Sequence, residues 1–362
     1  MSRGMRPSSV LSEAARNLAS GTSRAAILAT IFVALVGTVA ILDVRTVVDV
    51  LRNAAAYRAA GAAIQVIEAN DGIDGQRCDR LAATPGIVGS GALRAGERLR
   101  ALNLPSSELT VWEVTPGLPA LLAATEAPAG PQPGPGVWGP GVWLSADLAE
   151  TLGAGRGSEI ATSAGVMPVA GVYDWPDDGR VRDLGYAILA PVPAAGRFDQ
   201  CWAGIWPVDD ELSGLLLLSL VPDTSNPIRR QVNGSLGADH DAAAIFAGRL
   251  TRPAPVGALV IGLVLGAVAA RLRRLELAAA LHARVPKPQL AWQHLIEASA
   301  WTGAATVVAL AGTAYAAALG NPDPAGEVWL IGARSVAAGA IGVLLGTLAA
   351  VAATRERHLF RY

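Results

Sequence analysis

The chain has 362 residues, of which 52% are hydrophobic and only 16% are charged, and its formal net charge at pH 7 is −1. Soluble globular domains carry about 25% charged residues. This composition excludes a disordered chain and argues against an ordinary soluble enzyme.

Four apolar stretches are long enough to cross a bilayer as helices. They cover residues 25–42, 253–270, 298–320 and 328–354, and only Arg334 interrupts the last. Eighteen helical residues reach about 27 Å, close to the hydrocarbon thickness. A buried core helix is the alternative for any single stretch, but four such stretches bounded by charges predict four spans. The first is interpreted as an uncleaved anchor, because its apolar core is longer than that of a signal peptide.

Charge predicts the orientation of these spans. Arginines gather in residues 1–24, 271–297 and 355–362, whereas residues 44–252 hold 16 Arg and 23 acidic residues. Cytoplasmic loops near spans collect Lys and Arg. We therefore expect a multi-pass plasma-membrane protein with both termini in the cytoplasm, a cytoplasmic amphipathic helix within 1–24 and a short cytoplasmic tail.

The predicted fold class is an α-helical membrane protein with four transmembrane helices and a large mixed α/β extracytoplasmic domain, residues 43–252, between the first two. The first span is expected to continue outward as a helical stalk over 44–63. A Pro/Gly-rich linker at 127–141 is expected to join two lobes of the domain. Residues 215–221 read as a core element, and Ser145 as the N-cap of a helix ending at 152. The predicted strands are 63–68, 86–93, 110–114, 142–144, 159–162, 166–173, 186–190 and 201–207, and a further helix is 76–83.

The only two cysteines, Cys78 and Cys201, both fall in the extracytoplasmic domain. Thiols oxidise outside the cytoplasm, so the pair is predicted to form a disulfide. Two buried free thiols are the alternative. A metal site is disfavoured because no histidine lies near either cysteine in sequence.

The layout of one span, an extracytoplasmic α/β domain and three closing spans is similar to that of the FtsX-like, MacB-type ABC transporter permeases. Three segments carry the resemblance. Residues 10–18 resemble the family's amphipathic N-terminal helix, and residues 142–153 with 167–173 resemble its smaller external lobe. Residues 273–278, 289–290 and 297–298 resemble the cytoplasmic loop that meets the ATPase, although Arg284-Val285-Pro286 stands where the family has a Gly-Ala-Ser turn.

The resemblance implies a permease that forms a homodimer, or a heterodimer with a second permease, in the lipid bilayer and couples a separate cytoplasmic ABC ATPase to movement of its external domain. Its cargo would be a lipid, peptide or hydrophobic drug, or the movement would activate a cell-wall enzyme. The expected ATPase-coupling residues are Glu276, Leu281, Arg284, Lys287 and Gln289.

The residues of the 271–297 loop allow a physical interpretation of their own. We expect a helix from Leu272, a break at Pro286 and Pro288, and a second helix that carries a push into two spans. Arg271, Arg273 and Arg274 would anchor the first helix at phospholipid headgroups. A solvated basic loop that only sets topology is the alternative.

Catalytic signatures are missing from the sequence. The only lysine, Lys287, is not in a P-loop, no Gly-x-Ser-x-Gly elbow exists, and the four histidines are scattered. We expect no enzymatic activity, no catalytic residue, no cofactor, no metal and no nucleic-acid partner. Four acids could in principle gather calcium, but their Trp-Pro and Asp-Gly context favours a solvated turn: Asp174, Asp177, Asp178 and Asp183.

The sequence gives an expected environment for three residues near or within the predicted spans. Arg334 is expected to snorkel to the interface, or else to pair with an acid of another subunit. Trp301 and Trp329 are interpreted as interfacial belt residues. An ATP-independent membrane receptor or adaptor with a ligand-binding external domain is the alternative function, and a membrane-anchored hydrolase is a third.

Overall fold

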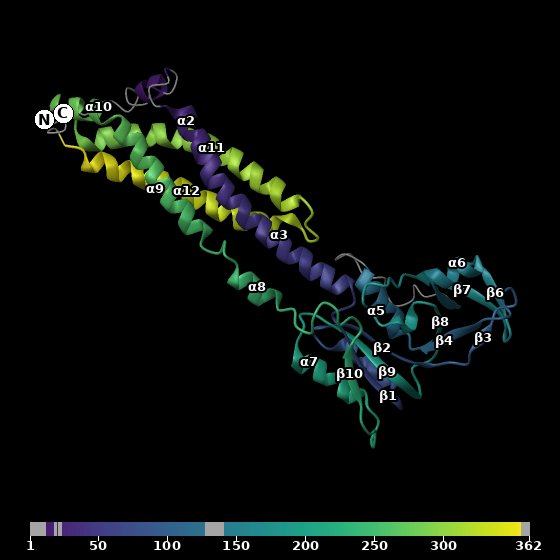
Figure 1. Cartoon of the computed structure of the whole chain (residues 1–362). Helices are drawn as coiled ribbons and strands as arrows, with labels where there is room; N and C mark the ends of the chain where they lie inside the picture. Colours follow the sequence, from purple (N-terminus) through teal and green to yellow (C-terminus); the bar gives the residue numbers. More distant parts are fainter. Residues whose placement is uncertain (1–11, 18–19, 21–23, 127–140, 356–362) are drawn as a thin grey trace. The chain divides into compact units, whose positions relative to one another are not determined.

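The computed structural model describes residues 12–17, 20, 24–126 and 141–355 (Figure 1). The chain divides into two compact units, one formed by residues 1–52 with 243–362 and the other by residues 53–242. Each unit has its own hydrophobic core. They are called here the helical unit and the sheet unit.

The helical unit contains four helical stretches that are long and apolar enough to cross a membrane. The first combines α2 (Ala25–Phe32), the π-helix η1 (Val33–Gly37) and α3 (Thr38–Ala59), whose last residues belong to the sheet unit. The others are α9 (Ala254–Leu272), α11 (Lys287–Ala318) and α12 (Ala325–Ala353). Residues 12–17 are also helical, and the rest of the predicted 10–18 helix lies outside the described residues.

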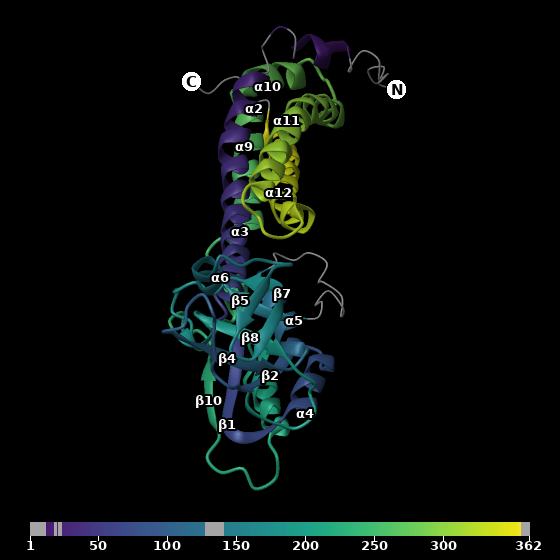
Figure 2. The same cartoon turned by 90° about the vertical axis from the view of Figure 1, so that its right-hand side faces the viewer.

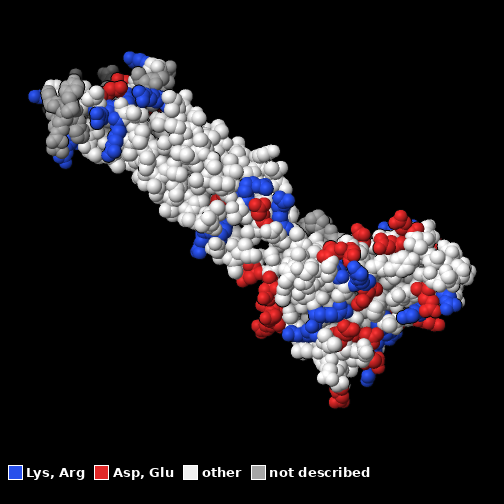
Figure 3. All heavy atoms as spheres, in the orientation of Figure 1, with Lys and Arg blue, Asp and Glu red and all other residues white. Residues whose placement is uncertain are grey.

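Small residues bring α9 and α12 into backbone contact. A Cβ atom on Gly262 would collide with the carbonyl oxygen of Gly339, and one on Gly266 with that of Val343. Close approach of this kind is how helices associate in lipid, where burial of apolar surface alone gives little gain. The visible face of the helices carries few charged atoms between the groups at their two ends (Figure 3).

The core of this bundle corrects one interpretation of the sequence. Trp301 is buried and packs with Phe32, Ala305 and Val336 rather than lying in an interfacial belt. Trp329 is partly buried, and its indole Nε1 donates to the carbonyl of Leu310 at 3.3 Å. Proximity to the end of a span does not determine which side of the helix a tryptophan occupies. Trp301 lies on the side that faces the other helices.

The sheet unit is built on one ten-stranded mixed sheet (Figure 2). The strand order is β10-β1-β9-β2-β4-β8-β5-β7-β6, with β3 paired to β4. The pairs β4–β8 and β5–β7 are parallel and the others are antiparallel. The strands are β1 (Ile64–Asp74), β2 (Ile87–Ala95), β3 (Leu99–Arg100), β4 (Glu108–Val114), β5 (Val142–Ser145), β6 (Glu159–Thr162), β7 (Gly165–Tyr173), β8 (Ala187–Pro191), β9 (Arg197–Ile205) and β10 (Ile228–Gln231).

Short helices cover this sheet. They are α4 (Gly75–Arg80), α5 (Gly117–Glu126), α6 (Ala146–Leu152) and α7 (Asp210–Gly214), with 3-10 turns η2 (Leu81–Ala83), η3 (Arg182–Leu184) and η4 (Leu215–Ser219). Leu118 and Leu121 of α5 are fully buried, although the sequence analysis predicted no helix there. The chain returns to the helical unit through α8 (Ala242–Gly248).

The prediction of two lobes takes a different form in the structure. Strand β8 lies between β4 and β5, so strands on both sides of the 127–141 segment join one hydrogen-bonded sheet. Residues 127–140 themselves lie outside the described residues. Local sequence patterns do not reveal this pairing, because β8, the parallel partner of β4, lies about 75 residues further along the chain.

Two local predictions have different outcomes. The predicted disulfide is confirmed: Cys78 of α4 is bonded to Cys201 of β9, and both residues are fully buried. Ser145 does precede α6, but its side chain does not cap that helix. Its hydroxyl instead accepts a hydrogen bond from the backbone N–H of Ala187 at 3.2 Å and so ties β5 to β8.

Candidate functional site

The connection between α9 and α11 is a short helix held between two tight turns. Helix α10 (Arg274–His282) follows a one-residue break at Arg273, and α11 begins at Lys287. Pro288 lies in the first turn of α11, where a missing N–H costs nothing, so it starts this helix rather than breaking it. Arg284 closes α10 in the left-handed region, with φ of 64°, a conformation that favours glycine.

The inner face of α10 belongs to a hydrophobic core. Leu277 and Leu281 of α10 are buried. They form one cluster with Leu290 of α11, Ala270 of α9 and Val351 of α12. Leu281, expected to face an ATPase, therefore holds α10 against the ends of three apolar helices. Helix α10 thus shares one hydrophobic core with α9, α11 and α12.

A buried ion pair adds a polar joint at the same place. Arg273 binds Glu297 of α11 through Nη1 and Glu276 of α10 through Nε at 2.8 Å. The side chains of Arg273 and Glu297 are only 11% and 5% exposed. The Asn17 side chain donates to the second oxygen of Glu297 at 2.8 Å. Arg273 is thus committed to the protein interior and is not available to anchor α10 at headgroups.

The remaining predicted coupling residues differ in their exposure. Lys287 Nζ donates to the carbonyl of Ala352 at 3.2 Å, near the C-terminal end of α12, where a cation is favourable. Gln289 is half-buried, and Glu276 and Arg284 are exposed. A cavity of about 460 Å³ lies beside Lys287 between the first turn of α11 and the last turns of α12. Lys287 therefore has a structural partner within the chain.

Two apolar side chains that the sequence analysis passed over are exposed on this connection. Leu275 of α10 is 58% exposed and Trp292 of α11 is 57% exposed. Spacing could have found them, since each lies opposite a buried residue one half-turn away, Leu277 and Leu290. Exposed large apolar side chains beside Arg274 and Arg284 give this end of the helical unit a mixed apolar and basic surface.

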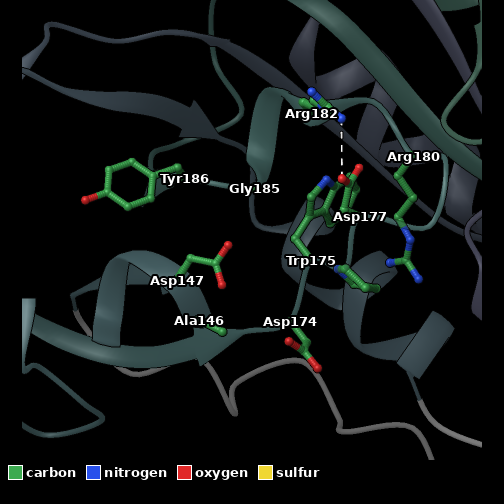
Figure 4. A pocket seen from close by; sticks show the side chains of 10 residues that line it. Ala146, Asp147, Asp174, Trp175, Asp177, Arg180, Arg182, Gly185 and Tyr186 are labelled. Atoms are coloured by element: carbon green, nitrogen blue, oxygen red, sulfur yellow. Dashed lines mark hydrogen bonds and ion pairs between the residues drawn. The ribbon is translucent and has the colours of Figure 1, made fainter. Parts of the chain in front are cut away.

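A second cavity lies in the sheet unit and has a volume of about 430 Å³ (Figure 4). It is found where the neighbouring parallel strands β5 and β7 end. Trp175 forms part of its wall, and the Trp175 indole donates to the carbonyl of Val181 at 2.8 Å. Asp147 and Tyr186 also line it (Figure 4).

The acids near this cavity bind arginines. Arg180 contacts Asp178 at 3.1 Å, Arg182 contacts Asp177 at 3.3 Å, and Arg230 contacts Asp183 at 3.4 Å. Within residues 12–17, 20, 24–126 and 141–355, no group of three or more acids, histidines or cysteines is arranged to hold a metal ion. Three of the four acids considered for calcium are thus paired with arginines.

Comparison with solved structures gives a structural likeness. No family model and no curated protein matches the chain. The chain is similar to the crystal structure of the periplasmic region of MacB from Actinobacillus actinomycetemcomitans, with 13% sequence identity and a TM-score of 0.35. The match covers 51% of this chain and 94% of the MacB structure.

Proposed function

We propose that the chain is the transmembrane permease subunit of an ABC transporter of FtsX/MacB type. In this proposal the four apolar helices cross the plasma membrane with both termini in the cytoplasm. A separate cytoplasmic ATPase docks on the α9–α11 connection, and its movement reaches an extracytoplasmic sheet unit. The cargo would be lipid, peptide or hydrophobic, or the movement itself would activate a cell-wall enzyme.

The observation that carries this proposal is the buried joint between Arg273 and Glu297. Burying a charge is costly unless it is paired, so the two side chains resist separation. Arg273 lies between α9 and α10, and Glu297 lies in α11. In this proposal a displacement of α10 by the ATPase would therefore be passed to both α9 and α11. A loop that only connects two spans needs no buried ion pair.

The exposed apolar and basic surface beside this joint supports a protein partner. Leu275 and Arg284 are available, whereas Leu281 and Lys287 are engaged within the chain. Interface cores are enriched in aromatic residues and arginine. The docking residues of the proposal are accordingly Leu275 and Arg284, with Glu276 and Gln289 beside them.

The test is co-purification of the full chain with the ABC ATPase encoded beside it. Leu275→Glu and Arg284→Glu should reduce the amount of ATPase recovered and its stimulated ATP hydrolysis. Arg156→Glu, also an exposed arginine but in the sheet unit, is the matched control. Unchanged recovery with both variants, beside a functional control, would contradict the docking role.

The cavity of the sheet unit favours a second candidate, an ATP-independent receptor or adaptor. Ligand sites in mixed α/β sheets tend to lie beyond the carboxyl ends of parallel strands, as this cavity does. Such a protein would bind its ligand without an ATPase. A ligand-induced change in tryptophan fluorescence, lost on Tyr186→Ala with no ATPase co-purifying, would favour this candidate.

A further inference from the structure

The segment around α8 exposes apolar side chains in an unusual density. Helix α8 has the sequence Ala-Ala-Ala-Ile-Phe-Ala-Gly and contains no buried residue. Ile245 is 49% exposed, and Leu250, just after the helix, is 94% exposed. Only Ala242 and Phe246 of this helix are partly covered, and its other side chains are exposed although all of them are apolar.

Two contacts locate residues 243–252 within the helical unit. Phe246 packs against a cluster that includes Val47 and Val48 of α3 and Ala317 of α11. Arg249 forms an ion pair with Asp43 of α3 at 3.1 Å. The segment is thus attached to α3 where the apolar part of the first helix ends and its charges begin.

Two exposed aromatic residues of α11 indicate the depth of that attachment relative to the proposed membrane. Trp292 and Tyr315 are both exposed and lie about 34 Å apart along the helix axis. This distance matches the hydrocarbon core with a little of each interface, where Trp and Tyr gather. Tyr315 directly precedes Ala316 and Ala317, which share the cluster with Phe246. Phe246 therefore lies at the level of the outer interface.

Exposed apolar side chains are found on several segments at this level. Leu42 precedes Asp43 and is 55% exposed, and Leu250 follows Arg249, so the ion pair places the two leucines at one depth. Just below, Val256 and Val260 of α9 are also exposed. Arg252 lies between Leu250 and these valines in sequence and is exposed, and its guanidinium suits lipid phosphate.

We propose that residues 243–252 dock on the outer leaflet of the membrane, with Ile245 and Leu250 among the lipid chains and Arg252 at the phosphates. The chain that returns from the sheet unit then enters the lipid interface before α9 begins. The occupant of this apolar surface is lipid, because the surface continues that of the membrane-crossing helices.

The test uses single cysteines labelled with the environment-sensitive fluorophore NBD in full-length protein. Cys78 and Cys201 are bonded to each other, so an added cysteine is the only free thiol. The variants Ile245→Cys and Leu250→Cys are reconstituted into phosphatidylcholine–phosphatidylglycerol vesicles with and without doxyl-labelled lipid. We expect blue-shifted NBD emission at both positions and loss of that emission with doxyl lipid.

Two controls make the outcome decisive. Leu102→Cys, an exposed leucine of the sheet unit at 67% exposure, should give water-like emission with no doxyl quenching. Val256→Cys on α9 should be quenched. If Val256→Cys is quenched and Leu250→Cys behaves like Leu102→Cys, the lipid docking is wrong. Blue-shifted emission of Leu250→Cys without doxyl quenching would mean that protein covers this surface, and it would also overturn the proposed lipid docking. If Val256→Cys itself is not quenched, the membrane crossing of the proposed function fails.

Discussion

Arg249 donates from Nε to Oδ1 of Asp43 at 3.1 Å, and both side chains are almost completely enclosed, at 6% and 0% exposure. The guanidinium also donates to the carbonyl of Phe246 and lies over the Phe246 ring. The pair joins α3 to the segment before α9, residues 206 positions apart in sequence. Asp43 Oδ2 has no hydrogen-bond partner among the described residues, so the carboxylate depends on this one arginine.

Breaking this pair is expected to destabilise the helical unit strongly. Arg249→Ala leaves a buried carboxylate without a counter-charge and should lower the free energy of unfolding by about 3–5 kcal/mol. Replacing both partners, Asp43→Leu with Arg249→Met, removes the buried charges and should restore most of that loss. Thermal unfolding in detergent micelles measures both. Arg252→Ala, at an exposed position, is the control, and an equal loss there would contradict the special role of Arg249.

The turn after α10 predicts a stabilising substitution. Arg284 has φ of 64°, which costs a residue with a Cβ atom about 1 kcal/mol relative to glycine. Arg284→Gly should therefore raise the free energy of unfolding by up to about 1 kcal/mol. The same substitution at Arg274, in the first turn of α10, should lower it. A destabilised Arg284→Gly would show that the arginine side chain makes a contact worth more than the strain.

The disulfide predicts a large effect confined to the sheet unit. Cys78 and Cys201 are 123 residues apart, and a loop of that size contributes about 4–5 kcal/mol in the chain-entropy model. Cys78→Ser should lower the unfolding free energy of this unit by that order. Reduction of the wild-type protein should reproduce the change, and a reduced wild type as stable as the oxidised one would contradict it.

Asp79, beside this disulfide, predicts a pH-dependent stability. Burial raises the pKa of the Asp79 carboxyl, while hydrogen bonds from the Thr115 hydroxyl and the Gly117 backbone N–H partly oppose the rise. The folded state then holds the proton more tightly than the unfolded state. The contribution of Asp79 is most favourable below the unfolded pKa of about 3.9 and is lost as pH rises through the raised folded pKa.

Asp79→Asn keeps an oxygen to accept these hydrogen bonds but cannot ionise. Relative to wild type, the variant should gain stability as pH rises through that interval and stay level above it. Urea unfolding of the full chain, followed by tryptophan fluorescence at several pH values, measures the difference. Glu150→Gln, at an exposed acid of α6, is the control and should show no such trend. A pH-independent difference for Asp79→Asn would mean that the carboxyl does not titrate in this interval.

Local sequence patterns determined much of this protein. The four apolar stretches became helices, and most predicted strands appear within a few residues of their expected bounds. Hydropathy and turn chemistry act over a few residues, so they can be read without knowing what lies elsewhere. The pairing of Cys78 with Cys201 was also accessible, because no other cysteine competes.

Only the tertiary structure decided which residues meet across long separations. Trp301 lies in the core while Trp292 is exposed. Arg273, which the sequence places in a basic cluster, is paired with the buried Glu297, and Asn17 binds the second oxygen of that carboxylate. The sequence shows that such residues lie near a helix end, but it does not show which neighbouring side chain covers them. The cost of burying a charge depends on partners that lie 24 to 280 residues away in sequence, and those partners come together only once the helices have packed.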